Sequence, residues 1–198
     1  DNYMHILTCY VEQDSKVRFM SFGHTILEDH GDAAIGNPVA IINQVDREVM
    51  DKSIRFLEET GYTGFANFDI KYDERDGKYR YFEINTRLGR SNFYITGSGF
   101  NAVKWIVDDL IYHKEFDDEI VIADHENLYT VVPKSIVLAY CGTLELKEQV
   151  QRLYREGKVS NPIDYKGERN IIHKLYVKYF MHTQKKRFKR FMELEGIK

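Results

Sequence analysis

The sequence has few of the features that mark secreted and membrane proteins. Only two of its 198 residues are cysteines, too few for the disulfide framework of a small secreted domain. Cys9 and Cys141 both lie in apolar stretches, so we expect them to be buried free thiols. No apolar run approaches the ~20 residues that cross a bilayer, and no signal peptide opens the sequence. These absences predict a cytoplasmic protein.

Two common catalytic arrangements are also missing. The sequence contains no glycine-rich phosphate-binding loop, and it has no Ser/His or Cys/His constellation of the kind that serves nucleophilic catalysis. It begins with Asp1 rather than Met and runs at once into a predicted strand. We therefore expect a segment of a larger protein, whose chemistry needs no nucleophilic side chain.

Charge is distributed unevenly along the chain. After residue 165 there are ten lysines or arginines and three glutamates, which gives this tail a formal charge of +7. Because the whole chain carries −3, the preceding residues carry −10. An acidic body suits a metal-binding enzyme domain. The basic tail, which also contains aromatic residues, suits either an anionic partner or a solvated helix face.

The most informative pattern is a strict alternation of polar and apolar residues in two neighbouring stretches. In residues 65–73 and 81–85 the polar positions fall on one face of each predicted strand and the apolar positions on the other. The polar set is Asn67, Asp69, Lys71, Glu83 and Asn85. The apolar set is Phe68, Ile70, Tyr72, Phe82 and Ile84. We expect Phe68, Ile70, Phe82 and Ile84 to be covered by a helix over about residues 46–60.

The segment between the two stretches predicts how they pair. Residues 75–77, Arg-Asp-Gly, are typical of a three-residue hairpin loop with the glycine in the left-handed conformation. The resulting register places Asp69 opposite Glu83 and Asn67 opposite Asn85. Directly opposed residues have Cβ atoms roughly 4.5–5.5 Å apart.

Two carboxylates at that separation repel each other. At an effective dielectric near 20 the repulsion is roughly 3–4 kcal/mol. A divalent cation removes this cost, and Mg²⁺ prefers a few protein oxygens together with substrate phosphates. The alternative is a solvated hairpin face that Lys71, Arg87 or Arg90 neutralises, and the spacing alone leaves both interpretations open.

The run Phe-Glu-Ile-Asn-Thr-Arg at residues 82–87 resembles a known family. A Glu-x-Asn-x-Arg strand, with an acidic residue about fourteen positions upstream on its partner strand, is similar to the C-terminal half of ATP-grasp ligases. The string Gly-Tyr-Thr-Gly-Phe at 61–65 and Gly-Phe-Asn at 99–101 add to a likeness to bacterial carboxylate–amine ligases that attach D-aspartate to peptidoglycan precursors. The resemblance covers about residues 1–113.

The resemblance implies a metal site on the hairpin. Asp69 and Glu83 would hold two Mg²⁺ ions against the phosphates of ATP, with Glu83 bridging the ions. Asn85 would ligate one of them. Arg87 would face the γ-phosphate or the acyl phosphate and is the expected catalytic residue.

Four further residues are candidates for ligand contact. Asn67 and His24 would contact ATP, although His24 can equally be a hydrogen-bonded structural residue. Arg90 and Ser91, which follow Gly89, would bind a substrate, or else they belong to a tight turn that only needs small residues. Residues 29–43 are expected to form a long loop, either a lid over the site or a surface excursion.

The expected fold is α+β. Residues 1–115 would form the C-terminal subdomain of an ATP-grasp domain, with an antiparallel sheet of two hairpins (about residues 5–28 and 65–85) and helices packed on one face. Residues 116–198 would form a subfamily-specific extension. It should contain a β-rich stretch at 130–140, a helix at 144–156 and a long basic helix from residue 170.

The implied function is ATP-dependent carboxylate–amine ligation through an acyl phosphate, with D-aspartate as the leading candidate for the amino-acid substrate. The expected partners are an amine acceptor, such as a cell-wall precursor, and a missing N-terminal ATP-binding half. No nucleic acid is expected. The alternative is a non-catalytic anion-binding module that uses the basic tail, and peripheral membrane contact through residues 185–190 is a related expectation.

Overall fold

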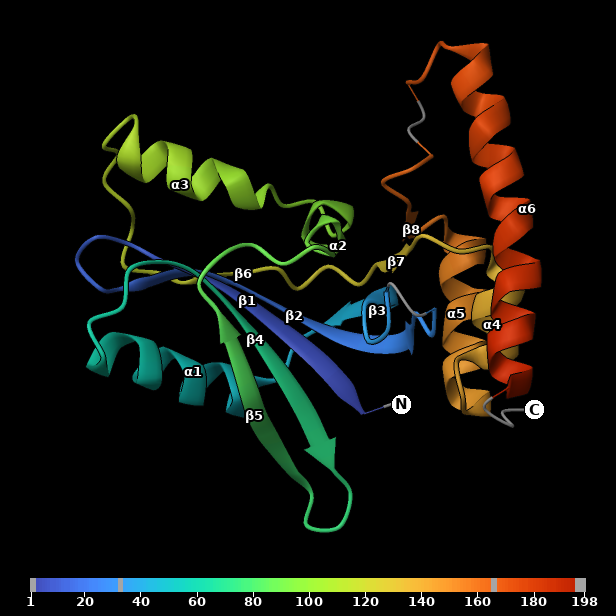
Figure 1. Ribbon diagram of the computed structural model, residues 1–198. Helices are drawn as coiled ribbons and strands as arrows, with labels where there is room; N and C mark the ends of the chain where they lie inside the picture. The colour runs from blue at the N-terminus through green and yellow to red at the C-terminus, as the bar shows by residue number, and fades with distance from the viewer. Residues whose placement is uncertain (1–2, 32–33, 165–166, 195–198) are drawn as a thin grey trace.

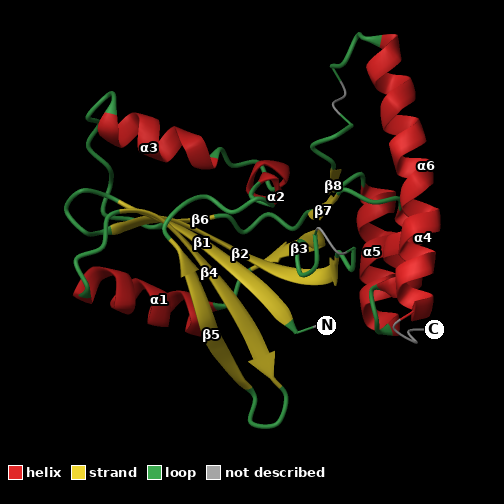
Figure 2. Ribbon diagram, viewed as in Figure 1, coloured by secondary structure: helices red, strands yellow, loops and turns green. Residues whose placement is uncertain are grey.

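The computed structural model describes residues 3–31, 34–164 and 167–194. One sheet forms its centre, in the order β5-β4-β1-β2-β3-β7-β8, with β6 paired to β2 (Figures 1 and 2). The strands are β1 Met4–Val11, β2 Val17–Glu28, β3 Pro38–Gln44, β4 Gly64–Asp73, β5 Lys78–Asn85, β6 Val121–Ile122, β7 Leu128–Thr130 and β8 Val159–Ser160. The helices are α1 Arg47–Glu59, α2 Phe93–Gly97, α3 Ala102–Leu110, α4 Lys134–Tyr140, α5 Leu144–Glu156 and α6 Ile171–Leu194.

The two predicted hairpins form half of this sheet. β1 pairs with β2 and β4 pairs with β5, both antiparallel, and β4 also pairs with β1 so that the hairpins lie side by side. The α+β class expected from the sequence is therefore confirmed. Side chains of β1 and β2 are almost all buried, because elements pack on both faces of these central strands.

The turn of the β4–β5 hairpin differs from the prediction. Its loop has four residues, 74–77, rather than three, and is closed by the pair Asp73 and Lys78. Gly77 does have the predicted left-handed backbone, with φ of 68°. A bulge then places one extra residue in β5, and beyond it the predicted register is restored.

The bulge decides which aromatic residue of β5 faces α1. Tyr81 packs edge-on against Phe68 and donates a hydrogen bond from its hydroxyl to the carbonyl of Val49 in α1, at 2.9 Å. Phe82, which was predicted to lie under the helix, is 57% exposed. That prediction is wrong because it assumed an unbroken alternation along β5.

Helices cover both faces of the sheet, not one as predicted. The Asp46 side chain caps α1 by accepting a hydrogen bond from the amide of Val49 at 3.0 Å, and the buried side of α1 packs on one face. On the other face, α2 and α3 pack over Tyr10, Phe19 and their neighbours. Figure 1 shows α1 below the sheet and α3 above it.

The segment between β2 and β3 is shorter than predicted. The loop expected over residues 29–43 ends at residue 37, because Pro38 begins β3. Val39, Ile41 and Ile42 are buried in this strand. The prediction gave too much weight to Gly36, Asn37 and Pro38 and too little to the apolar run that follows them.

Residues after 115 extend the same sheet and add a helical layer. β6 pairs with β2, β7 with β3 and β8 with β7, while α4, α5 and α6 pack around a core that includes residues of β2 and β3. The predicted helix at 144–156 is confirmed, as is the long C-terminal helix. A boundary near residue 115 stays a prediction.

The β-rich stretch predicted at 130–140 is wrong beyond Thr130. Residues 134–140 form α4, and Pro133 lies at its N-cap with φ of −60°. Proline has no amide hydrogen for a strand ladder and is well suited to the start of a helix. Among the described helices, none is long and apolar enough to cross a membrane.

Candidate active site

The polar face of the β4–β5 hairpin opens into a pocket of about 580 Å³. As predicted, Asp69 lies opposite Glu83 and Asn67 lies opposite Asn85. Strands β1 and β2 and residues 35–38 supply further parts of the wall. Of the candidate residues predicted from the sequence, the following line this pocket: Asn67, Asp69, Glu83, Asn85, Arg87, Arg90 and Ser91.

Asp69 is half-buried and faces a second carboxylate. Burial raises the pKa of Asp69, and the negative charge of Glu83 raises it further, while Arg87 acts in the opposite direction. Asn85 donates a hydrogen bond from Nδ2 to Oδ2 of Asp69 at 3.3 Å. This environment disfavours the ionised form of Asp69, so a cation bound between the two carboxylates would be stabilised.

Asn67 is fixed at the floor of the pocket. Its side chain is buried, and its Oδ1 accepts a hydrogen bond from Thr8 Oγ1 at 2.9 Å. A Cβ atom at Gly89 would lie 2.9 Å from Asn67 Oδ1. Because glycine has no side chain, the segment after β5 can fold back over Asn67 and bring Arg90 and Ser91 to the pocket.

Two arginines bring positive charge to the pocket. Arg87 and Arg90 are exposed, and neither forms an ion pair with any side chain in the described part of the chain. Arg87 Nη1 donates to the carbonyl of Leu88 at 3.2 Å. Exposed guanidinium groups without an ion-pair partner can bind carboxylate or phosphate oxygens in bidentate fashion.

Sequence reasoning missed two residues of β2 that line the same pocket. Thr25 is 1% exposed, and its hydroxyl has no hydrogen-bond partner among the described residues. Burial raises the pKa of Glu28, the positive charges of His30 and Lys71 act in the opposite direction, and the charge of Asp69 raises it slightly further. No sequence pattern marks either residue, because their proximity to Asp69 depends on the long-range pairing of β4 with β1.

His24 is not brought to the pocket. It lies opposite His5 in the β1–β2 ladder, and the two rings stack with centroids 4.6 Å apart. Since Thr25 lines the pocket, its neighbour His24 points to the other face of the sheet, where α1 packs. Burial, together with the nearby charge of His24, lowers the pKa of His5 to about 4. This placement suits the structural interpretation of His24.

The donor set of the pocket fits a hard divalent cation. Among the described residues, no group of three His, Cys, Asp or Glu side chains is arranged to hold a metal by itself. Asp69 and Glu83 supply two carboxylates and Asn85 adds an amide oxygen. Mg²⁺ is commonly held by one or two carboxylates plus substrate phosphates, so a site completed by phosphate oxygens fits these residues.

Comparison with known families agrees with this geometry. Residues 13–105 match the family model described as carbamoyl-phosphate synthase L chain, ATP binding domain. This part of the chain belongs to the ATP-grasp superfamily. The match includes β2, β3 and the whole β4–β5 hairpin, as well as the segment with Arg87, Arg90 and Ser91.

A curated relative covers almost the entire chain. The D-aspartate ligase of Enterococcus faecium (strain Aus0004) is 37% identical over 198 residues, which is 98% of this chain and 47% of that protein. The chain thus spans about half the length of this relative. Among solved structures, urea carboxylase of Kluyveromyces lactis gives a TM-score of 0.50 at 15% identity, over 64% of this chain and 12% of that one. This second likeness concerns the fold alone.

Proposed function

We propose that the chain is part of an ATP-dependent carboxylate–amine ligase and carries the metal- and phosphate-binding half of its active site. The observation behind this proposal is the opposition of Asp69 to Glu83, beside Asn85 and two arginines, in one pocket. The match to an ATP-binding family and the similarity to a ligase support it. The nucleotide-binding half would lie outside this chain, which spans 47% of the length of its 37% identical relative.

The residues of the pocket suit phosphoryl transfer to a carboxylate. Asp69, Glu83 and Asn85 would hold two Mg²⁺ ions, which neutralise charge on the phosphate oxygens. Arg87 would stabilise the charge that grows on the transferred phosphoryl group. Asn67, at the pocket floor, would help to position the nucleotide. Positioning and electrostatics suffice for this step, which explains why no nucleophilic side chain is needed.

We assign Arg90 and Ser91 to the carboxylate substrate. Arg90 has no ion pair among the described side chains, and Ser91 is buried at the pocket wall. D-aspartate is the substrate we propose for activation, on the strength of the 37% identical relative. A peptidoglycan precursor would supply the amine, and the reaction would take place in the cytoplasm.

The direct test is Mg²⁺-dependent ADP release by the full-length protein with a panel of L- and D-amino acids. We expect D-aspartate to stimulate release. Glu83→Gln keeps the size of the side chain but removes its charge, so it should lower the stimulated rate by roughly 10²-fold.

The matched control is Glu59→Gln, the same change at an exposed position of α1 away from the pocket. It should leave the rate unchanged. Stimulation that survives in Glu83→Gln would contradict the metal assignment, and absence of ADP release with every amino acid would contradict the ligase itself.

A second candidate, anion binding by α6, has one observation in its favour. An open groove of about 570 Å³ runs along this helix, and its lining includes Lys174, Lys178, His182 and Lys185. In residues 185–190, however, Arg187 pairs with Asp29 and Phe188 is buried in the core. Peripheral membrane contact would therefore rest on the remaining lysines and arginine. Failure of the ligase test would make this groove the leading site.

A further inference from the structure

A second cavity adjoins the metal pocket, and α6 forms one of its walls. This cavity measures about 280 Å³. It shares Arg90, Ser91, Asn37 and Pro38 with the larger pocket, so the two spaces meet at the segment that follows β5. The shared segment is also where we place the carboxylate substrate.

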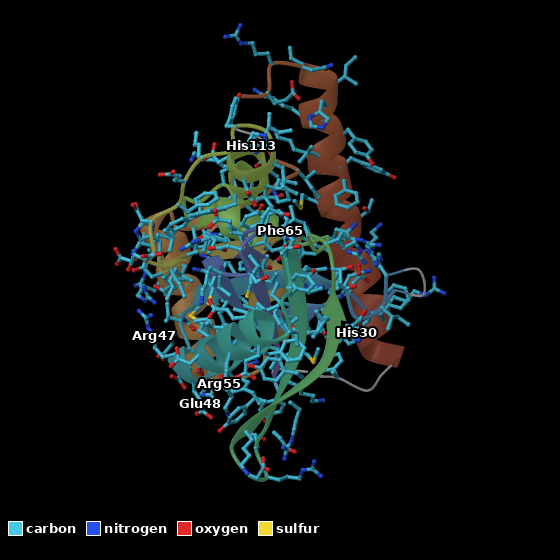
Figure 3. All side chains as sticks on the ribbon, turned by 90° about the vertical axis from the view of Figure 1, so that its left-hand side faces the viewer. His30, Arg47, Glu48, Arg55, Phe65 and His113 are labelled. Carbon is cyan, nitrogen blue, oxygen red and sulfur yellow. The ribbon has the colours of Figure 1, made fainter. Side chains whose placement is uncertain are left out.

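The α6 wall is anchored to the sheet. Arg187 forms an ion pair with the buried Asp29 at the end of β2, and its Nη1 donates to Gln184 Oε1 at 2.9 Å. Phe188 and Met192, each 2% exposed, belong to the core formed with β2 and β3. Figure 3 labels His30, which follows Asp29 in the segment that meets α6.

The chemistry of this compartment differs from that of the metal pocket. Its walls are mostly apolar, with Val39, Val132 and Phe180 among them. The charges of Asp29 and Arg187 compensate each other, whereas Arg90 at the junction has no carboxylate partner among the described residues. The interior therefore suits an uncharged, apolar group.

We propose that this compartment binds the amine substrate. The hydrocarbon chain that carries the amino group would lie against Phe180. The proposal rests on the ligase function proposed above. Burial among apolar walls lowers the pKa of a bound amine. The compartment thereby presents the neutral amine, which is the nucleophilic form, next to the site of carboxylate activation.

The reaction balances without a further reactant. A carboxylate oxygen attacks the γ-phosphorus of ATP and ADP leaves, which gives the acyl phosphate. The amine nitrogen then attacks the acyl carbon, the phosphate leaves with the C–O bonding electrons, and the proton lost by the nitrogen passes to the departing phosphate. Residues 171–194, outside the matched ATP-grasp region, would thus take part in substrate selection.

The test separates the two half-reactions with two amines of different size. Hydroxylamine traps the acyl phosphate as a hydroxamate and does not need an apolar compartment, whereas n-butylamine does. In the full-length protein with ATP, Mg²⁺ and D-aspartate, Phe180→Trp should fill the compartment. We expect amide formation with n-butylamine to fall at least about tenfold, with hydroxamate formation unchanged.

Two further variants complete the design. Tyr179→Trp adds the same ring at the neighbouring position, which is 67% exposed and does not line the cavity, and should alter neither reaction. Phe180→Ala widens the compartment and should raise the use of benzylamine relative to n-butylamine.

Equal loss of both reactions in Phe180→Trp, with the melting temperature preserved, would overturn the assignment. So would unchanged selectivity in both Phe180 variants, or a wild-type protein that forms the hydroxamate but no alkyl amide. Absence of the hydroxamate in the wild type would instead contradict the proposed ligase, and with it this inference.

Discussion

Asp69 is the residue whose surroundings say most about what the pocket binds. It is half-buried, it faces Glu83 across the hairpin, and both features raise its pKa. Glu83 itself is exposed, so solvent screens the repulsion below the roughly 3–4 kcal/mol expected at an effective dielectric of 20. The pair remains unfavourable in the absence of a cation.

This unfavourable pair predicts that Asp69→Asn stabilises the metal-free protein at neutral pH. The gain should be roughly 0.2–1 kcal/mol, the range typical of directly opposed cross-strand pairs. The sign follows from the raised pKa of Asp69. The protonated carboxyl of Asp69 makes its full contribution to the stability of the folded protein below the ordinary pKa of an aspartate. This contribution is lost as the pH rises through the raised pKa of Asp69 in the folded protein.

Urea denaturation of both proteins in EDTA, at pH 7 and near pH 3.5, measures this effect. The advantage of Asp69→Asn should be present at pH 7 and should shrink in acid. Mg²⁺ with ADP should then stabilise the wild type more than the variant. A variant less stable than the wild type at pH 7 without metal would contradict the interpretation.

The residue-scale predictions that held depend on local pattern. The opposition of Asp69 and Glu83 was predicted from the alternation within two strands joined by a short loop, and the structure contains it. His24, Thr25 and Glu28 could not be placed in the same way. Their relation to the hairpin depends on β1 lying between β2 and β4, and such long-range pairing leaves no mark in a single stretch of sequence.

At the scale of elements, the bulge in β5 has a sequence signal that is easily overlooked. Tyr79 and Tyr81 alternate in one phase, whereas Phe82 and Ile84 alternate in the other. The adjacent aromatics at 81 and 82 mark the change of phase. The loop prediction was one residue short, and the bulge compensates for it, so the register at Asp69 was right although its derivation was not.

The bulge predicts unequal effects of two alanine substitutions. Tyr81→Ala removes the contact with Phe68 and the hydrogen bond to Val49, and should cost about 2–3 kcal/mol. Phe82→Ala, at an exposed position, should change stability by no more than about 0.5 kcal/mol. Chemical denaturation measures both. The reverse order would show that β5 has no bulge and that Phe82 packs under α1.

At the scale of the whole molecule, the part of the chain outside the matched family is integrated with the part inside it. β6, β7 and β8 join the sheet, and Arg187 of α6 reaches Asp29 near the pocket. The sequence predicted the helices α5 and α6. It could not predict that α6 lines the cavity beside the pocket, because the contact of Arg187 with Asp29 joins residues 158 positions apart.

We propose that the β4–β5 hairpin holds divalent cations against nucleotide phosphates. The most direct measurement is anomalous diffraction from crystals of the full-length protein with Mn²⁺ and a non-hydrolysable ATP analogue. We expect anomalous peaks about 2.0–2.3 Å from carboxylate oxygens of Asp69 and Glu83, with phosphate oxygens completing the coordination. A nucleotide bound with its metal away from this hairpin would contradict it.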